Sequence, residues 1–498
     1  MRARRGCPAY LTVYLALCLA VLTSLCLALI EGARSNAVRM ETECITDIAM
    51  NSVLAEYHRE LFRQYNIFAL DSAYGTGLPG KVNAEGHLQY YLSANMSLKA
   101  HKMGLVADLF YRDMLALSPE DVEMTKVSIL TDQNGAVFRR LAVEAVKEDT
   151  GLGALEELQQ WLQTVEANDL KERNVAEEKA EIDEKIQNYD GMEIELTEME
   201  AEGESLWETV EIENPTESLE KIRKNGILGM VMDNTENLSQ SRLTQEQLVY
   251  ERMQQGRVSI GNMLPGKQSE AEELAECLLF QEYLMRYMGH YGRSVEGDAE
   301  ENVLQYQLEY LLAGRDSDRE NLESVADLLC AFREAANAAY IMTDQVKREE
   351  ADLLAAVLSA VLLIPELKDL FTASILLGWA YAESLYDVKQ LLAGERVPLM
   401  KDGSNWHYSL EGALRGVLEE GEQSEEGLSY EDYLRIFLCL CDLDTVTGRA
   451  MNMVEADIRR TPGNSGFRLD GCYAGIEAKI TVWSKYGYRY EIIREKGY

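Results

Sequence analysis

The chain has 498 residues, of which 47% are hydrophobic, and its 85 acidic side chains against 48 basic ones give a formal net charge of −37. This length corresponds to roughly two to four domains, and the apolar fraction suffices to build cores, which excludes wholesale disorder. A chain this acidic repels phosphate backbones, and no local basic patch offsets the charge, so nucleic acid is excluded as a partner. The histidines lie far apart and show no metal-ligand spacing.

The N-terminus carries the signal of a membrane-spanning helix. Arg2, Arg4 and Arg5 precede an uncharged stretch from Gly6 to Ile30. Its apolar and small residues form about 34 Å of helix, which is enough to cross a hydrocarbon core of about 30 Å. Positive charge on the N-terminal side predicts that this end is cytoplasmic and that the chain after about residue 31 is extracytoplasmic in the cell membrane.

Two other interpretations of this segment fit the sequence less well. A cleavable signal peptide has a shorter apolar core that ends at a small-x-small site, and the best small pair, Ser35 and Ala37, comes only after charged residues. A lipoprotein signal needs a small residue before its cysteine, whereas Cys18 and Cys26 each follow a leucine. We therefore expect an uncleaved anchor.

The predicted helix continues beyond the membrane as a stalk. Between Glu31 and Tyr65, Gly32 is the only Gly or Pro. A single rod from Pro8 to Tyr65 would be about 87 Å long. The apolar residues that recur at three- to four-residue spacing along the stalk are Ile45, Ile48, Ala55, Leu61, Phe62 and Tyr65.

The expected fold class is α+β, mainly α with a small β-sheet. Asp121–Leu130 alternates as a strand, and YAGIEAKITVW and YRYEIIRE, joined through SKYG, form a C-terminal hairpin that we expect to pair with it and to pack on the stalk helix. The predicted segments are a cytoplasmic N-terminus (1–7), a transmembrane helix (8–30), a stalk helix (31–70), a small α/β segment (71–150), an acidic helical arm or linker (151–270), a helical domain (271–465) and the hairpin (466–498).

Residues 151–205 contain seventeen acidic residues against four basic ones. We interpret this segment as a charged helix or coiled-coil arm that projects from the body, and a disordered acidic linker reaching to about Gly266 is the alternative. Farther along, the apolar run Leu353–Ile364 ends at Pro365 and is too short to span a bilayer, so we expect a buried core helix there.

Helix signals are frequent in the 271–465 segment. Ser or Thr followed three residues later by Glu or Asp predicts a capped start, and glycine after an apolar stripe predicts an end. The starts are Ser317 with Glu320 and Ser429 with Asp432, and the ends are Gly314 and Gly394.

Three patterns resemble chemical motifs and are better explained as structural features. Gly75–Gly80 matches G-x-G-x-x-G, but Pro79 removes a donor that a phosphate loop needs, so we predict a plain turn. Ser218–Lys221 matches S-x-x-K without the companion motifs of penicillin-recognising enzymes. The acidic pairs around Asp316 and Asp442 lack the spacing of calcium loops, and we expect helix caps.

The nine cysteines show no zinc pattern. On one helix Cys439 and Cys441 would point about 200° apart and could not bridge each other. Reduced thiols fit a helical core, and a disulfide from Cys472 to a helical partner is the alternative.

The opening RRGCPAYLTVYLALCLAVLTSLCLALIEGARSNAVRMETE resembles TadE/TadG-type pseudopilin relatives. Further segments with a family resemblance are Ser52–Asp71, Glu309–Val325, Trp379–Lys401, Leu428–Leu440 and GFRLDGCYAGIEAKI. Through these segments, nearly the whole chain resembles an uncharacterised membrane-anchored family of Gram-positive anaerobes, domain-of-unknown-function family 5702, often encoded beside Tad-pilus genes. This resemblance implies no activity and no catalytic residues.

Prepilin-type processing would cut between Gly6 and Cys7, but Leu11 stands where pilins carry a glutamate five residues later. We expect a structural or interaction protein, not an enzyme, that is an accessory or pseudopilin-like component of a Tad-type pilus or secretion assembly. Its expected partners are the cytoplasmic membrane and other pseudopilin or pilus-assembly proteins, with no metal and no small-molecule cofactor. The alternatives are a membrane-tethered envelope enzyme, such as a hydrolase, and an extracellular ligand-binding module.

Overall fold

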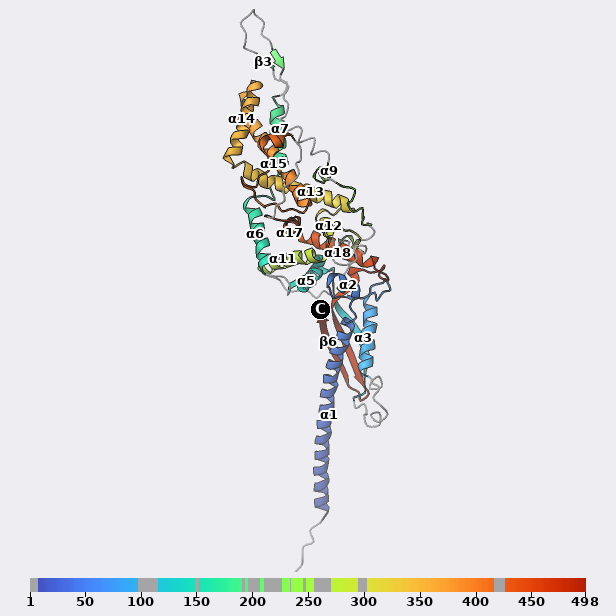
Figure 1. Cartoon of the computed structure of the whole chain (residues 1–498). Helices are drawn as coiled ribbons and strands as arrows, with labels where there is room; N and C mark the ends of the chain where they lie inside the picture. The colour runs from blue at the N-terminus through green and yellow to red at the C-terminus, as the bar shows by residue number, and fades with distance from the viewer. Residues whose placement is uncertain are drawn as a thin grey trace, which may run out of the picture. The chain divides into compact units, whose positions relative to one another are not determined.

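The computed structural model describes residues 8–96, 115–147, 152–189, 193–195, 207–209, 226–232, 234–244, 248–254, 270–293, 302–415 and 426–498 (Figure 1). The chain divides into two units, each described by itself. The stalk unit comprises Met1–Leu141, Glu251–Lys267 and Ile458–Tyr498, and the helical unit comprises Ala142–Tyr250 and Gln268–Asp457.

The stalk unit begins with the 47-residue helix α1 (Pro8–Leu54), which has two different halves. Up to Ile30 its large apolar side chains are exposed on every face. Among the described residues, it is the one helix that is long and apolar enough to cross a membrane. Beyond it, a buried stripe recurs every three or four residues, as expected for a helix face that packs on a core. The stripe consists of Val38, Thr42, Ile45, Thr46, Ala49, Met50 and Val53.

The expected rod to Tyr65 is interrupted, because α1 ends at Leu54. A separate short helix, α2 (Arg59–Tyr65), starts after His58, whose Nδ1 accepts the amide of Leu61 at 3.2 Å. The His58 amide donates to Ala69 O at 2.9 Å and so turns the chain back. Four of the six expected stripe residues therefore lie beyond the end of α1, and Ile48 on α1 is 51% exposed.

The stalk unit also contains a four-stranded antiparallel sheet. Its central strand is β5 (Cys472–Ser484), which pairs along one edge with β2 (Leu117–Ile129). Along the other edge, β5 pairs with β6 (Arg489–Gly497) and with the two-residue strand β1 (Leu70–Asp71). This confirms the predicted hairpin and its pairing with the 121–130 strand.

The predicted alternation holds along β5 and fails along β2. In β5, Ile476, Ala478, Ile480 and Val482 all point into the core. In β2 the register shifts between Met124 and Lys126, and Met124 and Val127 both reach the core although they are three residues apart. A bulge inserts one residue and reverses the alternation after it, which a strict period of two cannot anticipate.

One face of the sheet is covered by helices and the other is polar. The helix α3 (Lys81–Met96) buries Ala84, Leu88 and Leu92 in the same core as the α1 stripe and the sheet. On the opposite face, Lys126 pairs with Glu477 at 2.8 Å and Lys479 pairs with Glu491 at 3.0 Å. The predicted packing of sheet on stalk is confirmed.

The helical unit is built around α15 (Lys368–Leu392), which is buried on nearly every side. A helix that is apolar all round belongs in the centre of a fold, and α13 (Asp318–Ile341) and α14 (Gln345–Val361) pack against it. The remaining described elements of the chain are α5 (Asp132–Lys147), α6 (Leu152–Ala167), α7 (Val175–Gln187), β3 (Glu193–Glu195), β4 (Trp207–Thr209), α9 (Leu228–Val231), α10 (Val249–Gln254), α11 (Glu270–Tyr287), α12 (Gln307–Ala313), η1 (Pro365–Leu367), α16 (Leu410–Arg415), α17 (Tyr430–Leu440), α18 (Leu443–Arg460) and η2 (Leu469–Gly471).

The described part of the expected acidic arm up to Tyr250 belongs to this helical unit. Helix α7 buries Val175, Lys179 and Ile186, and it packs against α13 and α15. The prediction of a projecting arm is therefore wrong for α7. Its three buried side chains pack this otherwise charged helix against α13 and α15. Most of residues 190–270 lies outside the described residues.

The expectation of a buried helix at Leu353–Ile364 is also wrong for one face. Only the small residues Ala351, Ala355 and Ser359 of α14 are buried. Large apolar side chains cover its outer face. Their exposed fractions are 67% for Val346, 70% for Leu353, 60% for Val357 and 75% for Val361. We call these four residues the α14 stripe.

The predicted caps are confirmed. Ser429 and Asp432 form a capping box at the start of α17, and Ser317 Oγ accepts the amide of Glu320 at 3.3 Å at the start of α13. Gly314 ends α12 with a φ of 68°. The helices α17 and α18 are separate, because the carboxylate of Asp442 accepts the Thr445 amide at 2.8 Å and starts α18 anew.

The packing of the sheet on α1 can be tested with two isoleucines of the same hairpin. Ile480 is 0% exposed and Ile493 is 56% exposed. Ile480→Ala is expected to lower the free energy of unfolding by about 2–5 kcal/mol, because it leaves a cavity in the core, whereas Ile493→Ala costs under about 1 kcal/mol. Denaturant unfolding of the full chain in detergent measures both, and equal losses would contradict the burial of this face.

Candidate functional site

Two of the sequence candidates fall where the structure gives no geometry. The Gly6–Cys7 bond and the Ser218–Lys221 pattern both lie outside the described residues. Their roles stay predictions.

The glycine-rich segment Gly75–Gly80 is a turn between β1 and α3, as predicted. Gly75 and Gly77 have φ angles of 77° and 71°, which only glycine adopts at low cost. The turn packs directly on the loop before β5. A Cβ on Gly471 would lie 2.5 Å from the side chain of Pro79, so the turn and the segment before β5 are in close contact.

The acidic candidates act as braces of the backbone. The carboxylate of Asp442 caps α18, and Asp318 accepts the amides of Gln305 and Tyr306, each at 3.0 Å. Across the described ranges, no group of three or more His, Cys, Asp or Glu side chains is arranged to hold a metal ion.

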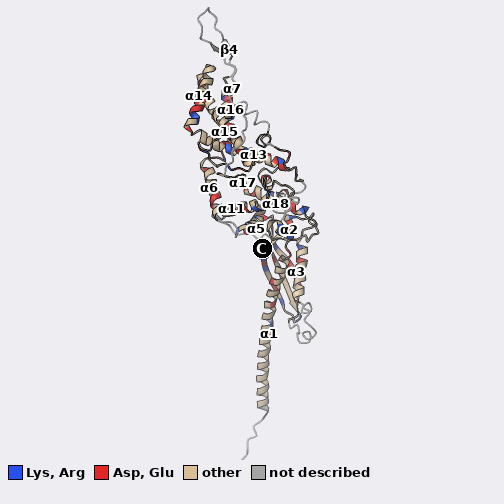
Figure 2. Cartoon of the chain, in the orientation of Figure 1, with Lys and Arg blue, Asp and Glu red and all other residues tan. Residues whose placement is uncertain are grey.

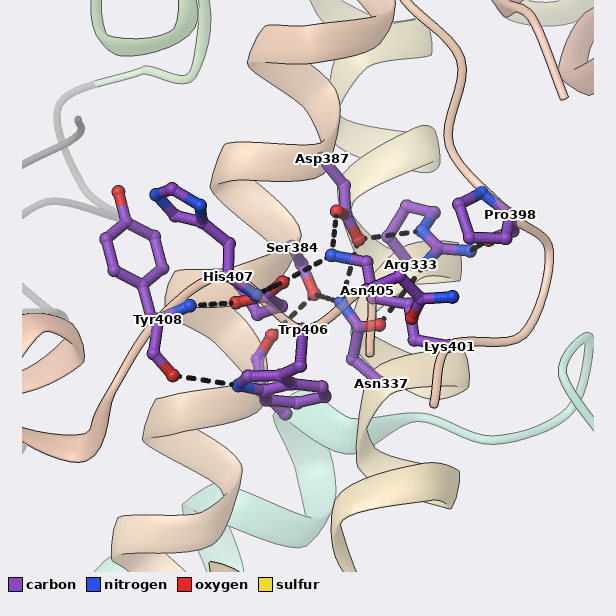
Figure 3. A network of polar contacts seen from close by, with 12 residues as sticks. Arg333, Asn337, Ser384, Asp387, Pro398, Lys401, Asn405, Trp406, His407 and Tyr408 are labelled. Atoms are coloured by element: carbon purple, nitrogen blue, oxygen red, sulfur yellow. Dashed lines mark hydrogen bonds and ion pairs between the residues drawn. The ribbon is translucent and has the colours of Figure 1, made fainter. Parts of the chain in front are cut away.

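A buried set of four charges in the helical unit is not among the candidates that the sequence indicated. Arg333 on α13, Glu383 and Asp387 on α15, and Lys401 in the following loop form what we call the charged clamp (Figure 3). Their side chains are at most 3% exposed. Two positive and two negative charges are thus buried together, which is the arrangement that buried charges require.

Arg333 is the hub of the charged clamp. Its Nε donates to Asp387 Oδ2 at 3.0 Å, and its Nη1 donates to the carbonyls of Pro398 and Leu399 at 3.0 and 2.7 Å. Nη1 also lies 3.0 Å from the hydroxyl of Tyr433 on α17. One guanidinium therefore joins α13, α15, α17 and the loop after α15, and its planar set of five donors suits this role.

Lys401 and Glu383 fix the rest of the loop. Lys401 Nζ pairs with Glu383 and lies 2.6 Å from Asp387 Oδ1. The two oxygens of Glu383 accept the amides of His407 and Tyr408 at 2.8 and 2.9 Å. A loop without regular structure thereby obtains partners for its buried amides, which would otherwise cost free energy.

Neighbouring positive charges favour the ionised form of Asp387 in the charged clamp. Burial acts to raise the pKa of Asp387, but the positive charges of Arg333 and Lys401 outweigh burial and lower this pKa. Because the four side chains are paired with one another and closed to solvent, the arrangement holds helices and loop together and offers no surface at which a substrate could meet these charges.

One signal in the sequence could have revealed the charged clamp. Glu383 and Asp387 are four residues apart in a segment that is otherwise apolar on every face, so both carboxylates must be buried on the same side of the helix. Their cationic partners come from distant positions, and only the tertiary fold identifies Arg333 and Lys401.

A second buried acid, Glu309 on α12, has a different electrostatic state. Its Oε1 accepts the amide of Tyr291 at 2.9 Å and the hydroxyl of Tyr430 at 2.8 Å. Among the described residues no hydrogen-bond partner reaches Oε2. Complete burial raises the pKa of Glu309 to about 7. This carboxyl therefore changes charge near neutral pH.

The cysteine expectations are resolved in part. The described cysteines are free thiols, and Cys472 Sγ lies 3.3 Å from Arg468 O, where it donates to the backbone. Cys439 on α17 hydrogen-bonds Cys277 on α11, and this contact, together with burial, raises the pKa of the Cys439 thiol. Cys439 is therefore protonated and a poor nucleophile.

Comparison with known proteins gives one match. A family model described as "Family of unknown function (DUF5702)" matches residues 205–484, which is more than half of the chain. The charged clamp and Glu309 lie inside the matched range, whereas α1 and β2 lie outside it. No curated protein and no solved structure matches the chain.

The charged clamp predicts a large effect at Lys401. Lys401→Met leaves two buried carboxylates with one cation, so the free energy of unfolding is expected to fall by about 3–5 kcal/mol. The control is Arg396→Met, because the Arg396 side chain is 48% exposed and lies 3.9 Å from Asp432. Such a surface pair is worth at most about 1 kcal/mol. Equal effects in denaturant unfolding of the two variants would refute the clamp.

The raised pKa of Glu309 predicts that the free energy of unfolding depends on pH. Since its pKa is raised from 4.5 to about 7, the folded state binds more protons than the unfolded state between these pH values, and stability falls as pH rises through them. The loss is about 3 kcal/mol and is complete above pH 7. Glu309→Gln is expected to remove this pH-dependent part of the stability.

The measurement is denaturant unfolding at several pH values between 4 and 8. The stability of Glu309→Gln relative to wild type should rise across the interval, and Glu349→Gln on the exposed side of α14 controls for loss of a carboxylate. Parallel pH profiles for Glu309→Gln and wild type would show that Glu309 does not titrate in this range.

Proposed function

We propose that this chain, which belongs to DUF5702, a family of unknown function, is a single-pass membrane-anchored protein whose body acts outside the cytoplasm as a structural or interaction module. In this proposal α1 spans the cell membrane with its N-terminus in the cytoplasm. No enzymatic step is part of it.

The proposal rests on the N-terminal half of α1 up to Ile30, whose large apolar side chains are exposed. We call this part of the helix the bare half. Its central leucines Leu19 and Leu22 are 61% and 57% exposed, and Figure 2 draws this part of the helix without a charged residue. Exposing so much apolar surface to water is unfavourable, at roughly 25 cal/mol per Å². A bilayer or a set of apolar partner helices removes this cost.

The continuity of α1 supports a mechanical role. The helix runs without a break from the bare half into the stripe that is buried against the sheet and α3. A continuous hydrogen-bonded helix is stiff, so the stalk sheet follows the position of the membrane segment. Arg2, Arg4 and Arg5 before the span, with the body after it, favour an extracytoplasmic body.

The resemblance of the N-terminus to pseudopilin relatives favours a Tad-type pilus or secretion assembly as the setting. In this setting the bare helix packs within the membrane against the apolar helices of pseudopilins or pilus-assembly proteins. Leu11 favours a stationary accessory component over a filament subunit, because it lacks the carboxylate that pairs with a neighbouring N-terminus. The α14 stripe supports an interaction role for the body as well, since exposed apolar patches mark contact sites.

The anchor is tested by placing charge at the centre of the proposed span. Each arginine there costs about 2.5–3.5 kcal/mol of insertion, so Leu19→Arg combined with Leu22→Arg is expected to release the protein from membranes that are washed with alkaline carbonate. Val82→Arg is the matched control, because Val82 is 73% exposed on α3. Retention of the double variant in the membrane would refute the anchor.

The intact mass and N-terminal residue of the protein from its native membranes test its processing. Digestion of intact cells with external protease tests its orientation. We expect an uncut chain whose body is digested from outside the cell. A start at Cys7 would favour incorporation into a pilus, and a start near Val38 would remove the anchor.

A further inference from the structure

The hairpin tip, residues Trp483–Tyr488, lies beside the end of the bare part of α1. The hydroxyl of Tyr488 donates to Glu31, and the guanidinium of Arg34 lies 4.2 Å above the ring of Tyr486. Glu31 is the first charged residue after the apolar segment that ends at Ile30. The tip is therefore next to the point at which α1 would leave the hydrocarbon core.

This position is fixed over the full length of β6. The strand runs along α1 in the same direction (Figure 1), with the hydroxyl of Tyr490 3.1 Å from Glu43 Oε1 and that of Tyr498 donating to Leu54 O. From residue 31 to residue 54 the helix advances about 35 Å, and from residue 488 to residue 498 the strand advances about 33 Å. The agreement of the two lengths keeps the tip at the level of Glu31.

The exposed side chains of the tip have the chemistry of a membrane interface. Trp483 is 43% exposed and Tyr486 is 48% exposed, and Lys485 between them is exposed as well. Tryptophan and tyrosine collect at the level of lipid head groups, and lysine and arginine are attracted to their phosphates. The tip thus combines aromatic and basic side chains beside the end of the apolar segment, although the whole chain has a net charge of −37.

We infer that the hairpin tip is a second membrane contact, in which Trp483, Lys485 and Tyr486 insert into the head-group layer beside α1. The inference rests on the proposed function, since it requires α1 to span the bilayer. The head-group layer adds about 5–7 Å on each side of the hydrocarbon core, so the few residues around Glu31 and the tip beside them lie within it. Contact at two places restrains the tilt of the stalk relative to the membrane.

The test uses the full chain in vesicles of phosphatidylcholine and phosphatidylglycerol that contain a lipid spin-labelled on its head group. In a Trp483→Phe background, Tyr486→Trp places a fluorescent reporter at the tip. The matched control is Ile493→Trp in the same background, because Ile493 is 56% exposed on β6 and lies about 16 Å farther along the strand. The fluorescence of the Trp483→Phe parent is subtracted from both.

We expect the Tyr486→Trp reporter to lose most of its fluorescence to the head-group label and the Ile493→Trp reporter to keep most of its own. Equal quenching of the two, or no quenching of either in vesicles that carry the protein, overturns the inference and leaves the anchor intact. Protection of the Tyr486→Trp reporter from aqueous acrylamide without lipid quenching indicates a protein neighbour and also overturns it. Failure of the protein to float with the vesicles overturns the proposed function instead.

Discussion

The burial of the second half of α1 against the sheet and α3 is the constraint on which the stalk unit depends. Val38, Ile45, Ala49 and Val53 on α1 meet a core completed by β5, β2, β6 and α3. Because the same helix continues as the bare apolar segment, this packing fixes the place of the sheet along the helix. The place of the hairpin tip follows from it, since β6 is bound to α1 at both of its ends.

The helical unit obtains its specificity from polar groups inside an apolar frame. A helix such as α15, which is apolar on every face, could pack in several rotations about its axis. In the observed rotation both Glu383 and Asp387 meet cations, which offsets part of the cost of removing these charges from water. Glu309 instead accepts hydrogen bonds from the Tyr291 amide and the Tyr430 hydroxyl, and burial raises its pKa to about 7.

The residues that the family model matches do not coincide with either structural unit. The matched range ends at residue 484, the last residue of β5. The strands that pair with β5, namely β1, β2 and β6, all lie outside the range. Among the described residues of the matched range the central strand therefore has no partner strand, and the sheet is complete only when the segments before and after it fold with it. We expect the family domain to require the stalk for stability.

The sequence by itself determined the elements whose signals are local. The apolar span to Ile30, the caps at Ser317 and Ser429, and the alternation along β5 each depend on neighbours within a few residues. Even the partner of the hairpin was foreseeable, because few other strands were available. The sequence did not reveal the end of α1 at Leu54, since that end is set by the Ala69 carbonyl that turns the chain back.

Only the tertiary structure decided which apolar and charged residues are buried. The run Leu353–Ile364 looked like core, yet α15 covers just its small residues and leaves Leu353 exposed. The carboxylates of α15 had a visible pattern, but their partners lie far away in the chain, at Arg333 and Lys401. Burial and ion pairing depend on which surfaces meet in space, and the spacing of residues along one segment does not contain that information.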